Sequence, residues 1–106
     1  MDSTGPPARE LTREEVDQLE GAVVLEFGAV WCNHCQALAP HLARLLHERP
    51  AVRHMRVEDG PGRPLGRSFR VKLWPTLVLL RDGQITAQLV RPTPEEAREA
   101  LDRLAS

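Results

Sequence analysis

The segment from residue 22 to residue 49 most constrains how this chain can fold. Residues 22–27 (AVVLEF) form an apolar run broken by one acidic residue, which is typical of a strand buried on both faces. From residue 32 to about residue 49, apolar side chains recur at steps of three and four, which predicts a helix. A strand that leads into a helix and then into a further strand favours a right-handed crossover with parallel pairing.

The remaining patterns extend this unit to an α/β protein. Thr12 with Glu15, and Thr93 with Glu96, have the spacing of capping boxes and predict two helix starts. Asp82-Gly83 between two apolar runs predicts a hairpin turn. The further predicted elements are strand 52–57, a short helix at 64–69, and strands 77–80 and 85–90. We therefore expect a mixed central β-sheet flanked by helices on both faces.

The length and charge of the chain limit the number of domains and the kinds of partner that it can have. A chain of 106 residues is short for more than one core, so we expect a flexible tail over residues 1–8 and a single domain over residues 9–106. A formal charge of −1 argues against a nucleic-acid binder. No apolar run is long enough to span a membrane, and the first ten residues do not resemble a secretory signal. We expect a cytoplasmic monomer.

The two cysteines carry the chemistry. Cys32 and Cys35 follow the predicted strand and open the predicted helix. Unpaired N–H groups and the helix dipole favour a thiolate at such a position, so the pKa of Cys32 should lie below its ordinary value. Cys35 lies one turn later, within disulfide reach but deeper in the fold. An exposed thiolate and a sheltered second thiol are what dithiol–disulfide exchange requires.

Two other interpretations of the cysteine pair remain open. The spacing also supplies half of many zinc sites, but tetrahedral zinc needs two further ligands. Among the histidines, His41 falls on a different helical face from Cys35, and His34 is expected to point away from the pair. An inert pair of buried cysteines is the remaining alternative.

The chain resembles the thioredoxin family from residue 9 to residue 104. The resemblance is carried by Trp31 and the two cysteines, Glu26-Phe27, Pro40, and Trp74-Pro75-Thr76 ahead of a strand and Asp82-Gly83. It implies a thioredoxin fold in which the bond before Pro75 is cis and in which Pro75 shapes the groove for substrate backbone. It also implies that the cysteine pair stores the electrons, so that no organic cofactor and no metal is required.

Glu26 corresponds to a buried aspartate of the family that exchanges a proton with the resolving cysteine. The lack of alternation around Glu26 indicates a strand covered on both sides. Burial raises the pKa of a carboxyl group, so the resemblance makes Glu26 the expected proton acceptor. A hydrogen-bonded core acid is the alternative. His54 matches a family lysine beside that acid, although a strand-surface histidine is the simpler description.

Several residues depart from the family pattern. Asn33-His34 replaces Gly-Pro, and a histidine before the second cysteine resembles disulfide isomerases and oxidases. A protonated His34 would stabilise the Cys32 thiolate and make the disulfide more oxidising. Trp74 is large for its position, and Leu73 and Arg91 stand where the family usually has glycines. We expect these substitutions to narrow or recharge the groove.

The predicted function is thiol:disulfide oxidoreduction with protein substrates, less reducing than in ordinary thioredoxin. Cys32 is the expected nucleophile and Cys35 the resolving thiol. Trp31, Trp74, Pro75 and Arg91 are the expected substrate-binding residues. The expected partners are protein thiols and disulfides and a reductase or other thiol donor. The alternative is a non-catalytic adaptor or chaperone that binds a partner protein through the same groove.

Overall fold

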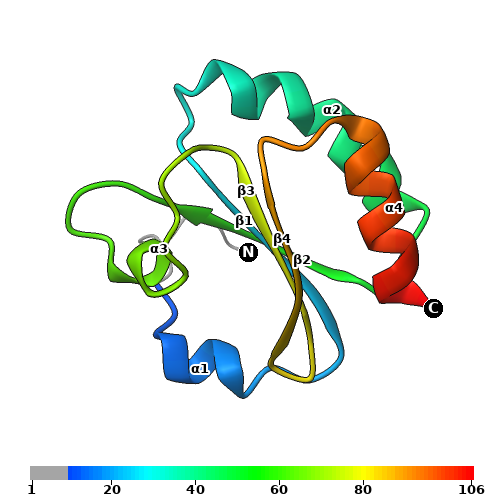
Figure 1. Ribbon diagram of the computed structural model, residues 1–106, viewed down its shortest axis with the longest axis horizontal. Coiled ribbons are helices and arrows are strands. Elements are labelled where there is room, and N and C mark those ends of the chain that lie inside the picture. Colours follow the sequence, from blue (N-terminus) through cyan, green and yellow to red (C-terminus); the bar gives the residue numbers. More distant parts are fainter. Residues whose placement is uncertain (1–9) are drawn as a thin grey trace, which may run out of the picture.

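The computed structural model describes residues 10–106, so the predicted tail lies outside the described residues. The helices and strands follow the predicted order and begin and end within about two residues of the predicted bounds (Figure 1). In chain order they are α1 (Arg13–Asp17), β1 (Ala22–Gly28), α2 (Asn33–His47), β2 (Arg53–Glu58), α3 (Pro64–Ser68), β3 (Thr76–Arg81), β4 (Gln84–Val90) and α4 (Pro94–Ala105).

The sheet has the strand order β2-β1-β3-β4. β1 pairs in parallel with β2 and antiparallel with β3, and β3 pairs antiparallel with β4. The parallel pair is the one that α2 connects, as the strand–helix–strand pattern predicted. The sheet is therefore mixed, and the predicted fold class is confirmed.

Helices cover both faces of this sheet. α2 and α4 pack on one face through Leu42 and Leu101, and α1 and α3 contribute Val16 and Leu65 to the other face (Figure 1). Successive side chains of a strand point to opposite faces, so β1 supplies both cores. Val24 lies in the α2 core and Leu25 in the α3 core. Glu26, two residues after Val24, therefore belongs on the face that α2 covers.

Local hydrogen bonds set the ends of the elements. Thr12 and Thr93 each accept a bond from the backbone N–H three residues on, and both capping boxes are complete. In the β3–β4 turn, Asp82 has φ 51° and Gly83 has φ 81°, the two positive values that a tight hairpin turn with matching twist requires. The Asp82 carboxylate also accepts a 2.7 Å bond from the Gly21 N–H. This bond ties the hairpin turn to the start of β1.

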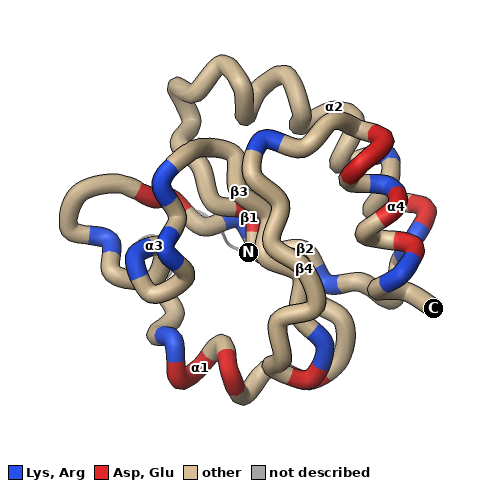
Figure 2. The backbone as a smooth tube through the Cα atoms, viewed as in Figure 1, with Lys and Arg blue, Asp and Glu red and all other residues tan. Residues whose placement is uncertain are grey.

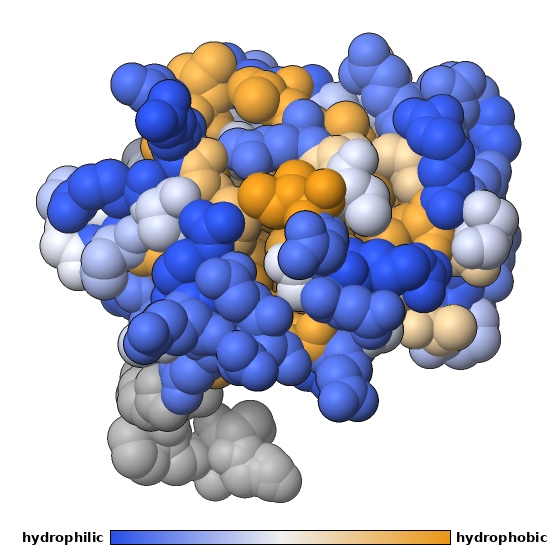
Figure 3. Space-filling view, turned by 60° about the horizontal axis from the view of Figure 1, so that its bottom comes forward, coloured by the Kyte–Doolittle hydropathy of each residue, from blue (hydrophilic) through white to orange (hydrophobic). Residues whose placement is uncertain are grey.

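Apolar side chains also reach the surface. On the face in Figure 3 they form orange patches bordered by hydrophilic residues. The most exposed large ones are Trp31, Val30, Val90, Leu73 and Ile85. Within residues 10–106, no helix combines the length and apolar content needed to cross a bilayer.

Candidate active site

Cys32 is the N-cap residue of α2. Its backbone is extended, with φ −81° and ψ 120°, and its Sγ accepts a 3.2 Å hydrogen bond from the Cys35 N–H. A side-chain oxygen fills this position in most helices, where it satisfies an otherwise unpaired N–H group. The sulfur therefore lies where the first turn of α2 stabilises negative charge.

The surroundings of Cys32 lower its pKa below the ordinary value. The expectation of an exposed Cys32 is wrong, because the residue is only 6% exposed, and this burial acts in the opposite direction on its pKa. Hydrogen bonds from the Cys35 side chain and N–H and from the His34 N–H, together with the positive charge of Arg91, outweigh that desolvation. The thiolate of Cys32 is thus favoured over that of an isolated cysteine.

Cys35 has the opposite character. Burial, the hydrogen bond that its thiol donates to Cys32, and the negative charges of Cys32 and Glu26 raise the pKa of Cys35 to about 11. Gly28, at the end of β1, allows this sulfur its position. A Cβ atom at residue 28 would lie 2.6 Å from the Cys35 Sγ, closer than real contacts permit. Cys35 thus remains a protonated thiol until something removes its proton.

Glu26 is a buried residue of β1, a strand that lies between β2 and β3 in the sheet. It is 5% exposed, and its Oε1 lies 2.7 Å from the His54 Nε2 and 3.8 Å from the Arg56 Nε. Residue 26 pairs with residue 56 across β1 and β2, which brings the arginine to the carboxylate. Glu26 and Cys35 line the same cavity of about 240 Å³. The buried acid and the high-pKa thiol therefore share one space.

The loop before β3 lies against Cys32. The Trp74–Pro75 peptide bond is cis, and the Trp74 carbonyl oxygen lies 4.0 Å from the Cys32 Sγ as an acceptor for its thiol. The same oxygen accepts a 2.8 Å bond from the Arg91 Nε, and the Arg91 N–H donates to the Pro75 carbonyl at 2.8 Å. Arg91 adopts φ 48°, in the left-handed region that favours glycine. Its guanidinium is therefore fixed beside the site.

Two tryptophans form the outer wall of the site. Trp31 is 69% exposed, and its ring meets the ring of Trp74 edge-on, with centroids 5.4 Å apart at 73°. The Trp74 Nε1 donates a 2.8 Å hydrogen bond to the Asp59 carboxylate. Sequence reasoning missed Asp59, because nothing in the turn after β2 indicates that it meets a residue fifteen positions later.

His34 lies at the site, although its imidazole makes no described contact with Cys32. The contribution of His34 to stabilising the Cys32 thiolate comes from its backbone N–H. The exposed side chain lines a separate pocket of about 300 Å³, together with His41, Pro75 and Arg91. Sequence reasoning expected Arg91 to recharge the groove but missed that its charge lowers the pKa of Cys32, because residues 32 and 91 come together only through the return of the hairpin.

The cysteine pair is not gathered with further metal ligands. Across residues 10–106, no group of three or more His, Cys, Asp or Glu side chains is arranged to hold a metal ion. Both cysteines are free thiols. What the arrangement offers is one low-pKa thiol, one high-pKa thiol and a buried carboxylate beside the second.

Known proteins share this arrangement of fold and sequence. A family model described as Thioredoxin matches residues 8–103. The structure of thioredoxin 2 from Pseudomonas aeruginosa PAO1 in its reduced form superposes with a TM-score of 0.83, at 51% identity and over 93% of each chain. Thioredoxin-3, mitochondrial, of Saccharomyces cerevisiae is 28% identical over 77% of this chain, and Protein disulfide-isomerase A2 of Pongo abelii is 40% identical over 72%. The chain spans 65% of the length of the yeast protein and 15% of the isomerase.

A mixed sheet with two cysteines at the start of α2, whose pKa values are shifted in opposite directions, defines a domain of the thiol:disulfide oxidoreductase class. The chain belongs to the thioredoxin family, whose model covers nearly all of it. The resemblance stated from the sequence is thereby confirmed.

Proposed function

We propose that the protein exchanges its dithiol with disulfides of protein substrates, with Cys32 as nucleophile and Cys35 as resolving thiol. The observation that carries this assignment is the split between the two thiols. The pKa of Cys32 lies below its ordinary value, whereas that of Cys35 is raised to about 11. At any given pH a larger fraction of Cys32 than of Cys35 is therefore thiolate, and the thiolate is the attacking species.

The two steps balance as follows. The Cys32 thiolate attacks one sulfur of a substrate disulfide, forms a mixed disulfide, and releases the other substrate sulfur as a thiolate. Cys35 then loses its proton and attacks the Cys32 Sγ, which forms the Cys32–Cys35 disulfide and releases the second substrate thiolate. Two electrons pass to the substrate, and its released sulfurs are protonated from solvent. A thiol donor or reductase returns the pair to the dithiol state by the reverse exchange.

Glu26 is the acceptor that we propose for the Cys35 proton. It shares a cavity with Cys35, and a bridging water is the route that such a polar space allows. His54, 2.7 Å away, holds the carboxylate in position. In single-turnover measurements, Glu26→Gln should slow the loss of the mixed disulfide and leave the initial attack by Cys32 unchanged. Equal slowing of both steps would remove this role.

The groove for substrate backbone is proposed at Pro75, between the exposed Trp31 and the fixed guanidinium of Arg91. Trp74 forms its wall through the ring contact with Trp31. Both cysteines, the buried acid and this wall come from one chain, which supports action as a monomer. Protein substrates fit because the exposed apolar side chains around Cys32 offer a contact surface.

We further propose that the Cys32–Cys35 couple is less reducing than that of ordinary thioredoxin. The groups that stabilise the thiolate include the charge of Arg91, and His34 adds positive charge when it is protonated. Stabilising the reduced form raises the potential, by roughly 30 mV for each 1.4 kcal/mol. Equilibration with glutathione buffers should give a value above about −270 mV. A value at or below it would refute this part of the proposal.

Matched serine variants test the exchange itself. Cys32→Ser should abolish reduction of a model disulfide protein, because no thiolate remains to attack. Cys35→Ser should also stop turnover but should accumulate a mixed disulfide through Cys32, which mass spectrometry detects. If Cys32→Ser turns over substrate like the wild type, the enzymatic assignment is wrong. Partner binding without any exchange would instead support the adaptor.

A further inference from the structure

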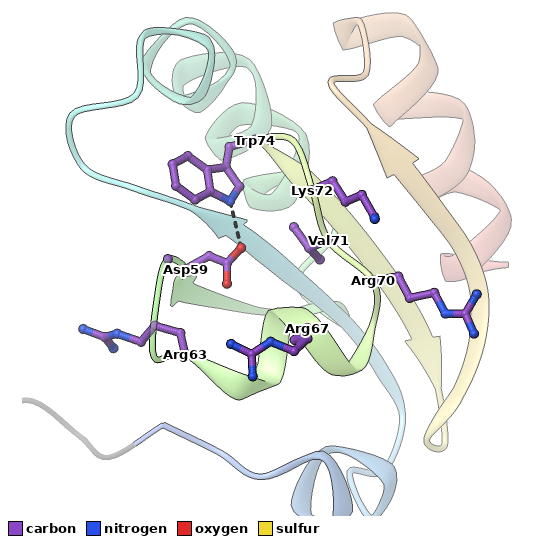
Figure 4. Close-up of a pocket in the computed structure, with 8 residues that line it drawn as sticks. Asp59, Arg63, Arg67, Arg70, Val71, Lys72 and Trp74 are labelled. Carbon is purple, nitrogen blue, oxygen red and sulfur yellow. Dashed lines mark hydrogen bonds between the residues drawn. The ribbon is translucent and has the colours of Figure 1, made fainter.

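A pocket of about 570 Å³ lies beside the active site, on the side of α3. Its walls carry Asp59, Arg63, Arg67, Arg70, Lys72 and Trp74 (Figure 4). We call it the basic pocket. Four of these six side chains are cationic, although the whole chain has a formal charge of −1. Positive charge is thus concentrated here, around α3, as the blue segments of Figure 2 show.

The cations of the basic pocket have no acidic partners within residues 10–106. Some arginines elsewhere are paired, for example Arg13 with Asp17 and Arg49 with Asp102. The carboxylate within the basic pocket, that of Asp59, accepts the hydrogen bond of the Trp74 indole. The positive charge is therefore not balanced by the described protein, and an anionic ligand would balance it.

The shape of the cluster indicates what kind of anion fits. Arg63 and Arg67 lie on the α3 side of the pocket, whereas Arg70 and Lys72 flank Val71 in the segment that connects α3 to β3 (Figure 4). The four charged groups fan out over the surface and do not converge on one point. A single compact anion cannot contact all of them. A segment of chain with several carboxylates, laid across the pocket, can.

Trp74 connects the basic pocket to the cysteines. Its indole N–H points to Asp59 on the pocket side, and its carbonyl oxygen faces the Cys32 thiol. A chain segment in the pocket would thus adjoin a segment that presents a sulfur to Cys32. This contiguity favours a protein substrate over an unrelated ligand, because one extended chain can occupy both places.

We propose that the basic pocket docks an acidic segment of the protein whose cysteine exchanges with Cys32. The inference rests on the proposed function and adds a substrate preference to it. Long-range attraction accelerates encounter between oppositely charged surfaces and weakens as salt is added. Substrates with aspartate or glutamate near the reactive cysteine should therefore react faster than neutral ones of the same length.

The test compares two peptides in the Cys35→Ser background, in which only the Cys32 attack takes place. Each peptide carries one cysteine in a mixed disulfide with a chromogenic aromatic thiol, flanked by either two aspartates or two asparagines on each side. Attack by Cys32 forms the protein–peptide disulfide and releases the coloured thiolate. At low salt, the acidic peptide should react about tenfold faster than the neutral one, and the ratio should fall as salt rises.

Charge reversal then locates the effect. Arg67→Glu with Lys72→Glu should bring the ratio of the two rate constants to one or below. The control pair, Arg53→Glu with Arg103→Glu, makes the same charge change at exposed positions at the start of β2 and in α4, and should keep most of the ratio. The neutral pair Arg67→Gln with Lys72→Gln should give a ratio between those of the wild type and the reversal. An unchanged rate with the neutral peptide in both variants shows that the loss of ratio is not caused by loss of folding.

Three results would overturn the proposal: no rate advantage for the acidic peptide, an advantage that survives reversal in the pocket, or an equal loss in the control. The neutral peptide separates this inference from the proposed function. If Cys32 attacks neither peptide, the exchange reaction fails; if it attacks both equally, only the acidic docking fails.

Discussion

At the scale of single residues, one arginine connects two parts of the site. Arg91 holds the Trp74 carbonyl through its Nε and lowers the pKa of Cys32 through its charge. Its left-handed backbone aims the side chain across the Pro75 loop. A glycine at this position would leave the loop free of that contact and would remove a positive charge from the thiolate.

Replacing that charge should raise the pKa of Cys32. In Arg91→Gln the thiolate loses a stabilising cation, so the rise of alkylation rate with pH should shift to higher pH. Arg91→Lys keeps a positive charge and should stay nearer to the wild type. The measurement is the pH dependence of alkylation in the Cys35→Ser background. An unchanged profile in Arg91→Gln would show that the charge of Arg91 does not contribute to the pKa of Cys32.

Residue by residue, the sequence predicted chemistry that depends on local geometry and missed what depends on tertiary contacts. The lowered pKa of Cys32 followed from its position at a helix start, which the buried strand before it and the helical periodicity after it indicate. The burial of Glu26 followed from a run without alternation. The contacts of Arg91 with Trp74 and of Trp74 with Asp59 join segments 15 or more residues apart. No periodicity encodes such contacts.

At the scale of elements, capping and pairing determine where each helix and strand begins. The capping boxes at Thr12 and Thr93 were readable from the sequence because their partners lie three residues away. The start of α2 was placed one residue early, since Cys32 is the N-cap and not the first helical residue. The order β2-β1-β3-β4 needed the additional rule that a crossover pairs its strands in parallel.

The cap of α4 offers a direct test at this scale. Thr93→Ala removes the oxygen that accepts the Glu96 N–H and should lower the free energy of unfolding by about 1 kcal/mol. Thr93→Ser keeps the oxygen and should lose less. Urea denaturation of the three proteins measures the difference. Equal stability of the alanine and serine variants would mean that the cap contributes nothing to α4.

At the scale of the whole molecule, the central sheet makes one unit of two cores. β3 places Leu79 in the core under α2 and α4, whereas its neighbour Leu80 lies in the core under α1 and α3. Neither core has a sheet of its own, so loss of one removes the support of the other. We expect unfolding to occur in one cooperative transition.

A substitution in either core should therefore destabilise the whole domain. Leu79→Ala and Leu25→Ala, both fully buried, should each lower the free energy of unfolding by about 2–5 kcal/mol. That is a large part of the roughly 5–15 kcal/mol typical of a domain. Fluorescence of the two tryptophans and far-ultraviolet circular dichroism should report the same midpoint for each variant. Separate midpoints would show that the cores unfold independently.

The Cys32 Sγ, which attacks the substrate, is also the atom that caps the first turn of α2. When Cys32 enters a disulfide, its Sγ loses the negative charge that the Cys35 N–H binds most strongly. The strength of the hydrogen bond from the Cys35 N–H to the Cys32 Sγ therefore depends on the redox state. The bond is stronger in the dithiol state and weaker while a partner is attached through a disulfide. The first turn of α2 thus loses the charge on its cap when Cys32 forms the mixed disulfide, and regains it only when a thiol donor returns the pair to the dithiol state.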